Sequence, residues 1–289
     1  MLRVAGWLLF IVGVAGQIGP AIVRQGSGLV LPSAVVLSVG CVLLVAAERR
    51  FTAGTFSAGG AAGDEPTRTL LRRVCLIGAP AVLVAIESFH PAGFTPEVYA
   101  ILSQPQAGYF GPHWWMTLHL IQTPMIGLVA AGMWLLVAGQ TTVWAWLARI
   151  AAVVFVVYYT VLDAVGGIYL GWLLSSPLNA PNAASRPAIE TIVTTMWTDP
   201  LIGGVGSVVS QVGSWAFLVT ALSAALALAR QQAPLWPLAA IVLAGNLVQL
   251  SHARPYGPLG FGLLLIGAVG IELWRTRAGL AVTPLANTG

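Results

Sequence analysis

Apolar residues run along this chain in long stretches that polar positions scarcely interrupt. A helix needs about 20 mainly apolar residues to cross the hydrocarbon of a bilayer. Stretches near this length predict an all-α protein: a polytopic membrane helix bundle with about eight transmembrane helices and a single integral membrane domain over residues 1–289. The predicted spans are 5–23, 29–47, 72–90, 114–138, 143–174, 202–229, 233–251 and 257–274.

Three polar segments separate these spans. Residues 51–69 are rich in Gly, Ala, Ser and Thr and predict a flexible cytoplasmic loop, whereas residues 91–112 and 175–201 are predicted outer loops. Within the outer loops, the stretches FTPEVYAILSQ and SRPAIETIVTTMW both place a hydroxyl residue shortly before a proline, which is typical of a helix start. We therefore expect two short interfacial helices on the outer surface.

Composition supports the membrane assignment. Hydrophobic residues make up 57% of the chain and charged residues only 8%, whereas soluble domains carry about 25% charged residues. The excess of Ala, Gly and Val, with arginine in place of lysine, indicates a high-GC bacterial source. The net charge of +4 is explained by arginines that flank the spans, so membrane lipids are the expected partners and no nucleic acid is.

The arginines predict the orientation of the chain. If the N-terminus is inside, ten arginines are cytoplasmic and only Arg24, Arg186 and Arg254 are outside. This distribution predicts a multi-pass protein of the bacterial inner membrane with both termini in the cytoplasm. Glu272, which lies near Arg275 and Arg277 in sequence, is expected to be an interfacial charge. The ten arginines are Arg3, Arg49, Arg50, Arg68, Arg72, Arg73, Arg149, Arg230, Arg275 and Arg277.

The histidines all fall at the outer ends of predicted spans. These residues are His90, His113, His119 and His252. His113 precedes a tryptophan pair and is expected to anchor the chain at the membrane surface. The other three, together with the neutral polar residues Gln122, Asn246 and Gln249, predict a polar pocket that opens outward.

Two carboxylates lie within the spans. Glu87 is three residues before His90, on the same helical face, and Asp163 lies inside the span 143–174. A charged side chain in hydrocarbon costs at least about 2.5 kcal/mol, so both should face the interior of the bundle. Gly166 and Gly167, which follow Asp163, are expected to allow close helix contact beside it.

These residues support a metal-site hypothesis first. His90, His119 and His252 would bind zinc or iron, and Glu87 or Asp163 would be a further ligand or the catalytic base. The ligands must converge from three helices. Imidazoles more than about 10 Å apart could not share an ion, because metal–nitrogen bonds are about 2 Å long. Haem held between His90 and His119 is a variant of this hypothesis.

Two further hypotheses need no metal. Glu87 or Asp163, held protonated by burial, could protonate a lipid-soluble substrate, as in a terpene-cyclase-like membrane enzyme. Alternatively, the same residues could serve a proton-coupled transporter or a binder of a lipid or quinone. No internal repeat is visible, which disfavours an inverted-repeat transporter. The sequence favours an integral membrane enzyme or redox protein that acts on a lipophilic small-molecule substrate at the outward-facing pocket.

Two C-terminal stretches carry a family resemblance. The segments PLIGGVGSVVSQVGS and SHARPYGPLGFG resemble parts of multi-pass actinobacterial membrane proteins of unknown function. This resemblance covers about the C-terminal third of the chain. It implies a multi-pass membrane protein and no particular activity.

Overall fold

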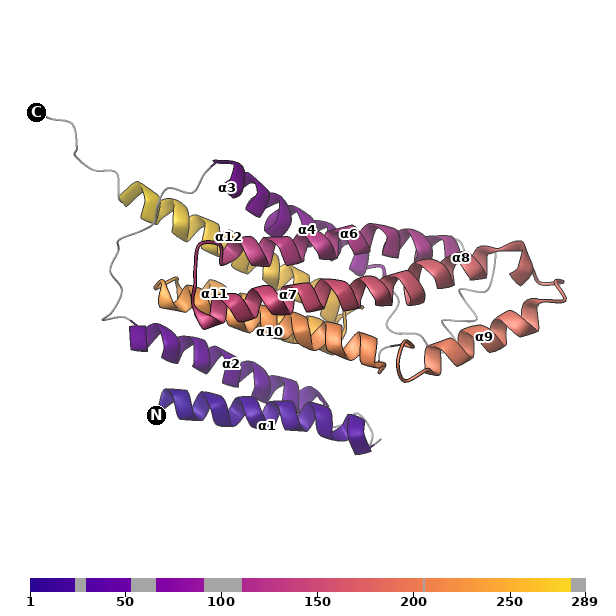
Figure 1. The fold of residues 1–289 in the computed structure, drawn as a ribbon, viewed down its shortest axis with the longest axis horizontal. Helices are drawn as coiled ribbons and strands as arrows, with labels where there is room; N and C mark the ends of the chain where they lie inside the picture. Colours follow the sequence, from indigo (N-terminus) through magenta and orange to yellow (C-terminus); the bar gives the residue numbers. More distant parts are fainter. Residues whose placement is uncertain (24–29, 53–65, 91–110, 205, 282–289) are drawn as a thin grey trace, which may run out of the picture.

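The computed structural model describes residues 1–23, 30–52, 66–90, 111–204 and 206–281. Helices and short connections account for all of these residues, so the prediction of an all-α fold is confirmed for the described chain. Long rods run side by side, and the N-terminal helix pair lies along one edge of the bundle (Figure 1).

Two of the rods contain a π-helical insertion. The first rod consists of α3 (Pro66–Arg73), the π-helix η2 (Val74–Gly78) and α4 (Ala79–Glu87), and the second of α7 (Val143–Leu162), the π-helix η4 (Asp163–Tyr169) and α8 (Leu170–Ser175). The remaining elements are α1 (Leu2–Val23), α2 (Val30–Thr52), α6 (Pro112–Leu136), η5 (Pro177–Asn179), α9 (Arg186–Thr198), α10 (Val208–Arg230), α11 (Leu235–Leu250) and α12 (Tyr256–Ala281).

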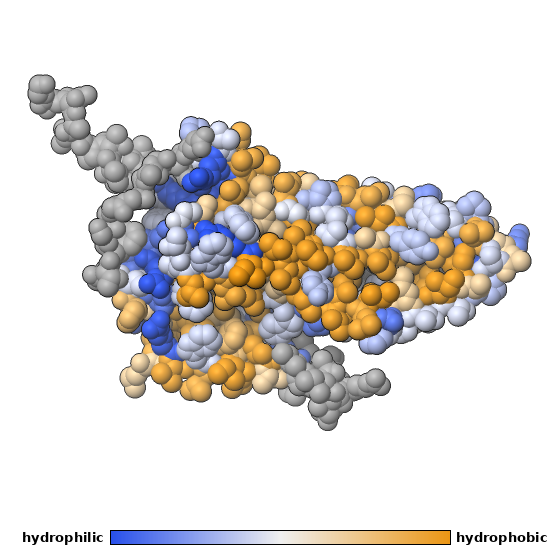
Figure 2. Space-filling view, in the orientation of Figure 1, coloured by the Kyte–Doolittle hydropathy of each residue, from blue (hydrophilic) through white to orange (hydrophobic). Residues whose placement is uncertain are grey.

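Among the described residues, five helices are long and apolar enough to cross a membrane. They are Pro66–Glu87, Pro112–Leu136, Val143–Ser175, Val208–Arg230 and Tyr256–Arg277, and the helical segments Leu2–Gln17 and Leu235–Leu250 are apolar but shorter. Figure 2 shows apolar residues along the rods and hydrophilic residues at the end that holds the N-terminus and α3. The protein is therefore membrane-embedded, and the count of eight spans remains a prediction.

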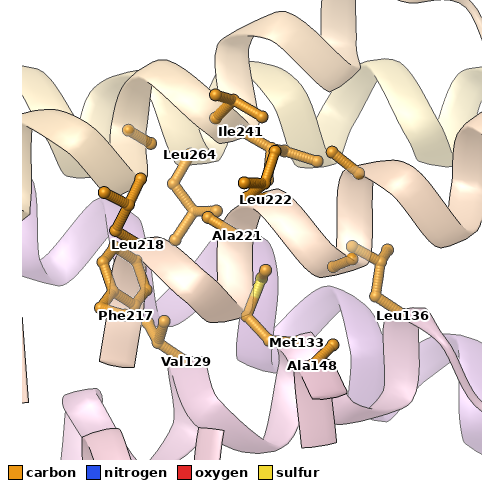
Figure 3. Close-up of a cluster of buried hydrophobic side chains, with 14 of the residues drawn as sticks. Val129, Met133, Leu136, Ala148, Phe217, Leu218, Ala221, Leu222, Ile241 and Leu264 are labelled. Atoms are coloured by element: carbon orange, nitrogen blue, oxygen red, sulfur yellow. The ribbon is translucent and has the colours of Figure 1, made fainter. Parts of the chain in front are cut away.

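The core is built around α10, which is buried along most of its length and packs against α7, α11 and α2. Many buried positions of α10 are alanines, and small residues let neighbouring helices approach closely where lipid provides no hydrophobic driving force. Larger side chains fill the remaining space, among them Met133, Phe217 and Leu264 from three different helices (Figure 3).

One end of the bundle, which we call the arginine end, carries Arg72, Arg149, Arg230 and Arg275. Buried Arg72 forms an ion pair with Glu272 of α12, and Arg73 lies 3.4 Å from the same carboxylate. Glu272 is thus paired with arginines of α3, a helix far from it in sequence, rather than being only an interfacial charge beside Arg275 and Arg277.

Other polar groups at the arginine end also have partners within the protein. Arg149 donates to the carbonyl oxygens of Val137 and Gln140 at 2.7 and 2.9 Å, and Arg275 donates to the carbonyl oxygen of Leu136 at 2.7 Å. Each arginine therefore satisfies carbonyl groups at the end of α6 or just after it, where a helix leaves its last carbonyls without intrahelical partners.

The helix α9 was predicted within the loop 175–201. Ile189 and Val193 are its buried positions, and they pack in a cluster with Trp115 and Leu170, which gives the helix one apolar face. The Ser185 hydroxyl does not cap α9 but donates to the carbonyl oxygen of Leu178 at 2.6 Å. The other expected interfacial helix, in residues 94–104, lies outside the described residues, and the placement of both helices on the outer surface remains a prediction.

Candidate functional site

Three histidines converge at the end of the bundle opposite the arginine end. His90 follows α4, His119 lies in the first turns of α6, and His252 lies in the connection between α11 and α12. One ring nitrogen of each residue lies within 4.8 Å of those of the other two. This distance is well below the separation of about 10 Å beyond which imidazoles could not share one metal ion. We call these residues the histidine cluster and this end of the bundle the histidine end.

Aromatic packing holds the rings of the cluster. The His90 ring centroid lies 5.3 Å from that of His119 and 5.1 Å from that of His252. The centroid of the Trp115 ring lies 4.7 Å from that of His119 and 5.0 Å from that of His90. Its indole N–H donates to the carbonyl oxygen of Gly166 at 2.9 Å, which ties α6 to the π-helix η4.

A backbone hydrogen bond determines which nitrogen of His119 keeps a lone pair. Nδ1 of His119 lies 2.7 Å from the carbonyl oxygen of Trp115, one helical turn earlier. A carbonyl can only accept, so Nδ1 carries the proton and Nε2 keeps its lone pair. Histidine ligands of metals are commonly oriented in this way.

The backbone of η4 supports the other side of the His119 ring. A Cβ atom at Gly167 would lie 2.2 Å from Cγ of His119, so only glycine allows the ring to sit against the helix. A π-helical turn is uncommon and often occurs at functional sites. Here it begins at Asp163, so one local irregularity places both the aspartate and the glycine at the cluster.

A small cavity adjoins the histidine cluster, with a volume of about 30 Å³. Trp115, Leu162 and Trp197 form apolar walls, while the three histidines, Asp163 and Ser251 are the residues of its lining with polar side chains. A cavity needs a volume of roughly 10–15 Å³ to hold a single water molecule. The volume of this cavity therefore suits an ion with one or two waters.

Asp163 is almost fully buried, with 1% of its surface exposed. Its Oδ2 accepts a hydrogen bond from Thr123 at 3.3 Å, and Oδ1 has no partner among the described residues. The single proton of the Thr123 hydroxyl is shared between Asp163 and the carbonyl oxygen of His119, which lies closer to the hydroxyl, at 2.8 Å. Asp163 thus lies beside the cluster with one buried oxygen that has no partner among the described residues.

Glu87 is fully buried, and neither of its carboxyl oxygens has a hydrogen-bond partner in the described chain. It is close enough to Asp163 for their charges to interact, but it is not among the residues that line the cavity. No ion pair joins either carboxylate to an arginine of the described segments. The two predicted catalytic residues are therefore buried together, with Asp163 at the cavity and Glu87 one turn beyond His90 toward the arginine end.

The other predictions for histidine also have an outcome. His113 is exposed at the start of α6 and is not part of the cluster, and its role as a surface anchor stays a prediction. Burial, together with the nearby His90 and His119 rings, holds the pKa of His252 well below its usual range. A neutral imidazole is the form that binds a metal.

Several residues of the site were missed from the sequence. Trp115 and Thr123 lie four residues before and after His119, so a helical projection of α6 could have found them. Gly167 was assigned to helix contact, and its actual partner, His119, could not be inferred without the packing of α6 on η4. Trp197 and Ser251 have no signal in the local sequence.

Together, the fold and the site define a membrane-embedded, all-helical protein with a histidine cluster, two members of which are buried, next to a small cavity. No protein-family model, curated protein or solved structure matches the chain.

Proposed function

We propose that the protein is an integral membrane metalloenzyme in which His90, His119 and His252 bind one divalent transition metal ion, zinc or iron. The observation that carries this proposal is that a nitrogen from each ring lies within 4.8 Å of the other two. Nitrogen ligands on a tetrahedral ion are roughly 3.4 Å apart for bonds of about 2.0–2.1 Å. Side-chain movements of about 1 Å would close the remaining difference.

Charge balance supports a cation at this position. Glu87 and Asp163 are buried without a basic partner in the described chain, and an uncompensated buried charge is strongly unfavourable. A divalent ion on three neutral imidazoles would offset both carboxylates. At the histidine end, no arginine of the described chain forms an ion pair with Glu87 or Asp163.

The arrangement suits catalysis better than a purely structural role. Catalytic zinc sites have three protein ligands and keep a fourth position for water or substrate, whereas structural sites use four protein ligands. The cavity beside the cluster provides room for that position, and Asp163, which has one oxygen without a partner in the described chain, is part of its lining. Asp163 would act as general base toward a water in the cavity, which favours metal-assisted hydrolysis or hydration.

The surroundings of the cavity favour a lipophilic substrate. Trp115, Leu162 and Trp197 form apolar walls, and the long apolar helices place the site in or near the membrane. Only the reacting group fits in about 30 Å³, so the rest of the substrate would remain between the helices and the lipid. With the predicted orientation, this site faces the outside of a bacterial inner membrane, opposite the arginine end.

Haem fits this site poorly. Pockets for drug-sized ligands already need roughly 300–1,000 Å³, and a haem macrocycle is at least that large. The space next to His90 and His119 is about 30 Å³, and the His252 ring packs 5.1 Å from the His90 ring where a macrocycle would need to extend.

A second candidate function is metal-free acid catalysis. It is favoured by Glu87, which is buried in an apolar bundle without a partner in the described residues and could hold a proton for transfer to a substrate. Proton-coupled transport would use the same residue.

Metal analysis and an absorption spectrum of the purified protein test the proposal. We expect about one zinc or iron per chain and no haem Soret band. The His90→Ala/His119→Ala variant should lose the metal, whereas His113→Ala, which alters an exposed histidine outside the cluster, should retain it. If the wild-type protein binds no stoichiometric metal even after incubation with zinc or iron(II), the proposal is wrong and acid catalysis or transport gains support.

A further inference from the structure

A polar residue stands three positions along the chain from each histidine of the cluster, on the side toward the arginine end. Glu87 stands three residues before His90, Gln122 three residues after His119, and Gln249 three residues before His252. The helices α4 and α11 run toward the histidine end while α6 runs away from it, so all three offsets point the same way. Together with Asp163, these residues form what we call the second polar layer.

The second polar layer is buried but its polar atoms lack protein partners. Exposed fractions are 0% for Glu87, 0% for Gln122, 7% for Gln249 and 1% for Asp163. Unpartnered atoms within the described chain are both carboxyl oxygens of Glu87, both amide atoms of Gln122, Oε1 of Gln249 and Oδ1 of Asp163. Buried polar groups in proteins are almost always paired with protein or with ordered water. Glu87 and Asp163 lie close enough for their charges to interact, and the offsets of Gln122 and Gln249 place them at the same level of the bundle, which indicates a shared occupant.

We propose that the second polar layer holds a cluster of water molecules that continues the cavity beneath the histidine cluster and connects it to Glu87. The donors and acceptors distinguish water from a second cation. A cation would contact only acceptor oxygens, whereas Nε2 of Gln122 is an unpartnered donor beside unpartnered acceptors. Water donates and accepts, so it satisfies both kinds of atom.

This water cluster would give the proposed enzyme a proton route. A proton taken up from cavity water by Asp163 would pass through the bound waters to Glu87, whose carboxylate becomes a neutral carboxyl group. The proton route depends on the proposed function. The water cluster depends only on the unpartnered atoms, so the two can fail separately.

Radiolytic labelling offers a test with an internal control. X-rays split bound water in place, and the hydroxyl radicals modify adjacent side chains, which mass spectrometry then locates. Tyr159 interacts electrostatically with Asp163 and Glu87. Phe155 lies one turn earlier in α7, with its ring centroid 4.8 Å from that of Tyr159 and 4.6 Å from that of Phe217. Both rings have 0% exposure.

We expect Tyr159 to be labelled several-fold faster than Phe155 in detergent-solubilised wild-type protein, after each rate is divided by its rate in the unfolded chain. Equal rates would overturn the proposal. The Glu87→Leu/Gln122→Leu variant should lower the Tyr159 rate to that of Phe155, and a rate that stays at the wild-type level would also contradict it. If this variant does not fold, Glu87→Leu alone replaces it and is judged by the same outcomes.

Gln17→Leu is the matched control variant. Gln17 is also a buried glutamine with both amide atoms unpartnered in the described chain, but it lies on α1, outside the second polar layer. Gln17→Leu should leave the labelling rate of Tyr159 unchanged. A lower Tyr159 rate in this variant would overturn the assignment of the water cluster to the second polar layer. Labelling with and without a chelator separates the two proposals, because the water cluster persists even if no metal ever binds.

Discussion

At the arginine end of the bundle, Glu272 is paired with Arg72 and Arg73, whereas at the histidine end Glu87 has no protein partner in the described chain. Both carboxylates are buried in the same helical bundle. The Glu272 carboxylate has its charge partners within the protein, and its ion pairs join α3 to α12. The Glu87 carboxylate can have a hydrogen-bond or charge partner only if something other than the described protein residues lies beside it.

This difference separates a structural role from a binding role. A buried ion pair connects helices, and its energetic consequence is seen when one partner is removed. A cluster of buried, unpartnered polar groups next to a cavity points instead to a ligand, because leaving such groups dry is unfavourable. We therefore expect substitutions at the arginine end to change stability and substitutions at the histidine end to change metal binding.

The largest expected effect on stability is at the arginine end. The Glu272→Leu substitution leaves buried Arg72 without its carboxylate partner and should lower the free energy of unfolding by about 3–5 kcal/mol. The double variant Arg72→Leu/Glu272→Leu should recover most of this loss. Chemical denaturation in detergent measures both, and a single variant within about 1 kcal/mol of wild type would contradict a structural role for the pair.

The next largest expected effect is a loss of metal affinity when the contact between Gly167 and the His119 ring is changed. Gly167→Ala would place a Cβ 2.2 Å from Cγ of His119, so the ring must move and metal affinity should fall about 10–100-fold. Gly166→Ala is the matched control, because its Cβ would meet nothing closer than Trp197 at 3.6 Å. Competition with a fluorescent zinc chelator measures both affinities. Equal affinities for the two variants would show that the ring position does not depend on η4.

A smaller effect is expected at Trp115. The Trp115→Phe substitution removes the indole N–H that donates to Gly166 but retains the carbonyl that accepts from His119. Metal affinity should therefore fall by no more than about tenfold, at the lower end for residues that orient a ligand. A complete loss of metal binding, measured with the same chelator, would mean that Trp115 does more than position the cluster.

Much of the fold and part of the site could be predicted from the sequence. The apolar runs predict helices, and their order fixes which end each polar residue occupies. For that reason, His90, His119 and His252 could be assigned to one end without knowledge of their packing. His113 could be set apart because it precedes Trp114 and Trp115 at the start of its span.

The contacts between helices could not be predicted. Glu272 pairs with Arg72, 200 residues away in sequence, rather than being only an interfacial charge beside Arg275, because α12 packs against the rod that contains α3 and α4. Likewise, the role of Gly167 depends on how α6 lies against η4. Such pairings are set by tertiary packing, and a single sequence carries no local signal for them.

The central claim is that His90, His119 and His252 bind one metal ion. X-ray absorption spectroscopy of the metal-loaded protein tests it most directly, because it reports the kind, number and distance of the atoms around the metal. We expect three imidazole nitrogens at about 2.0–2.1 Å from the metal and one further light atom, with one nitrogen fewer in His119→Ala. A shell of sulfur or of oxygen alone, or a spectrum unchanged in His119→Ala, would contradict it.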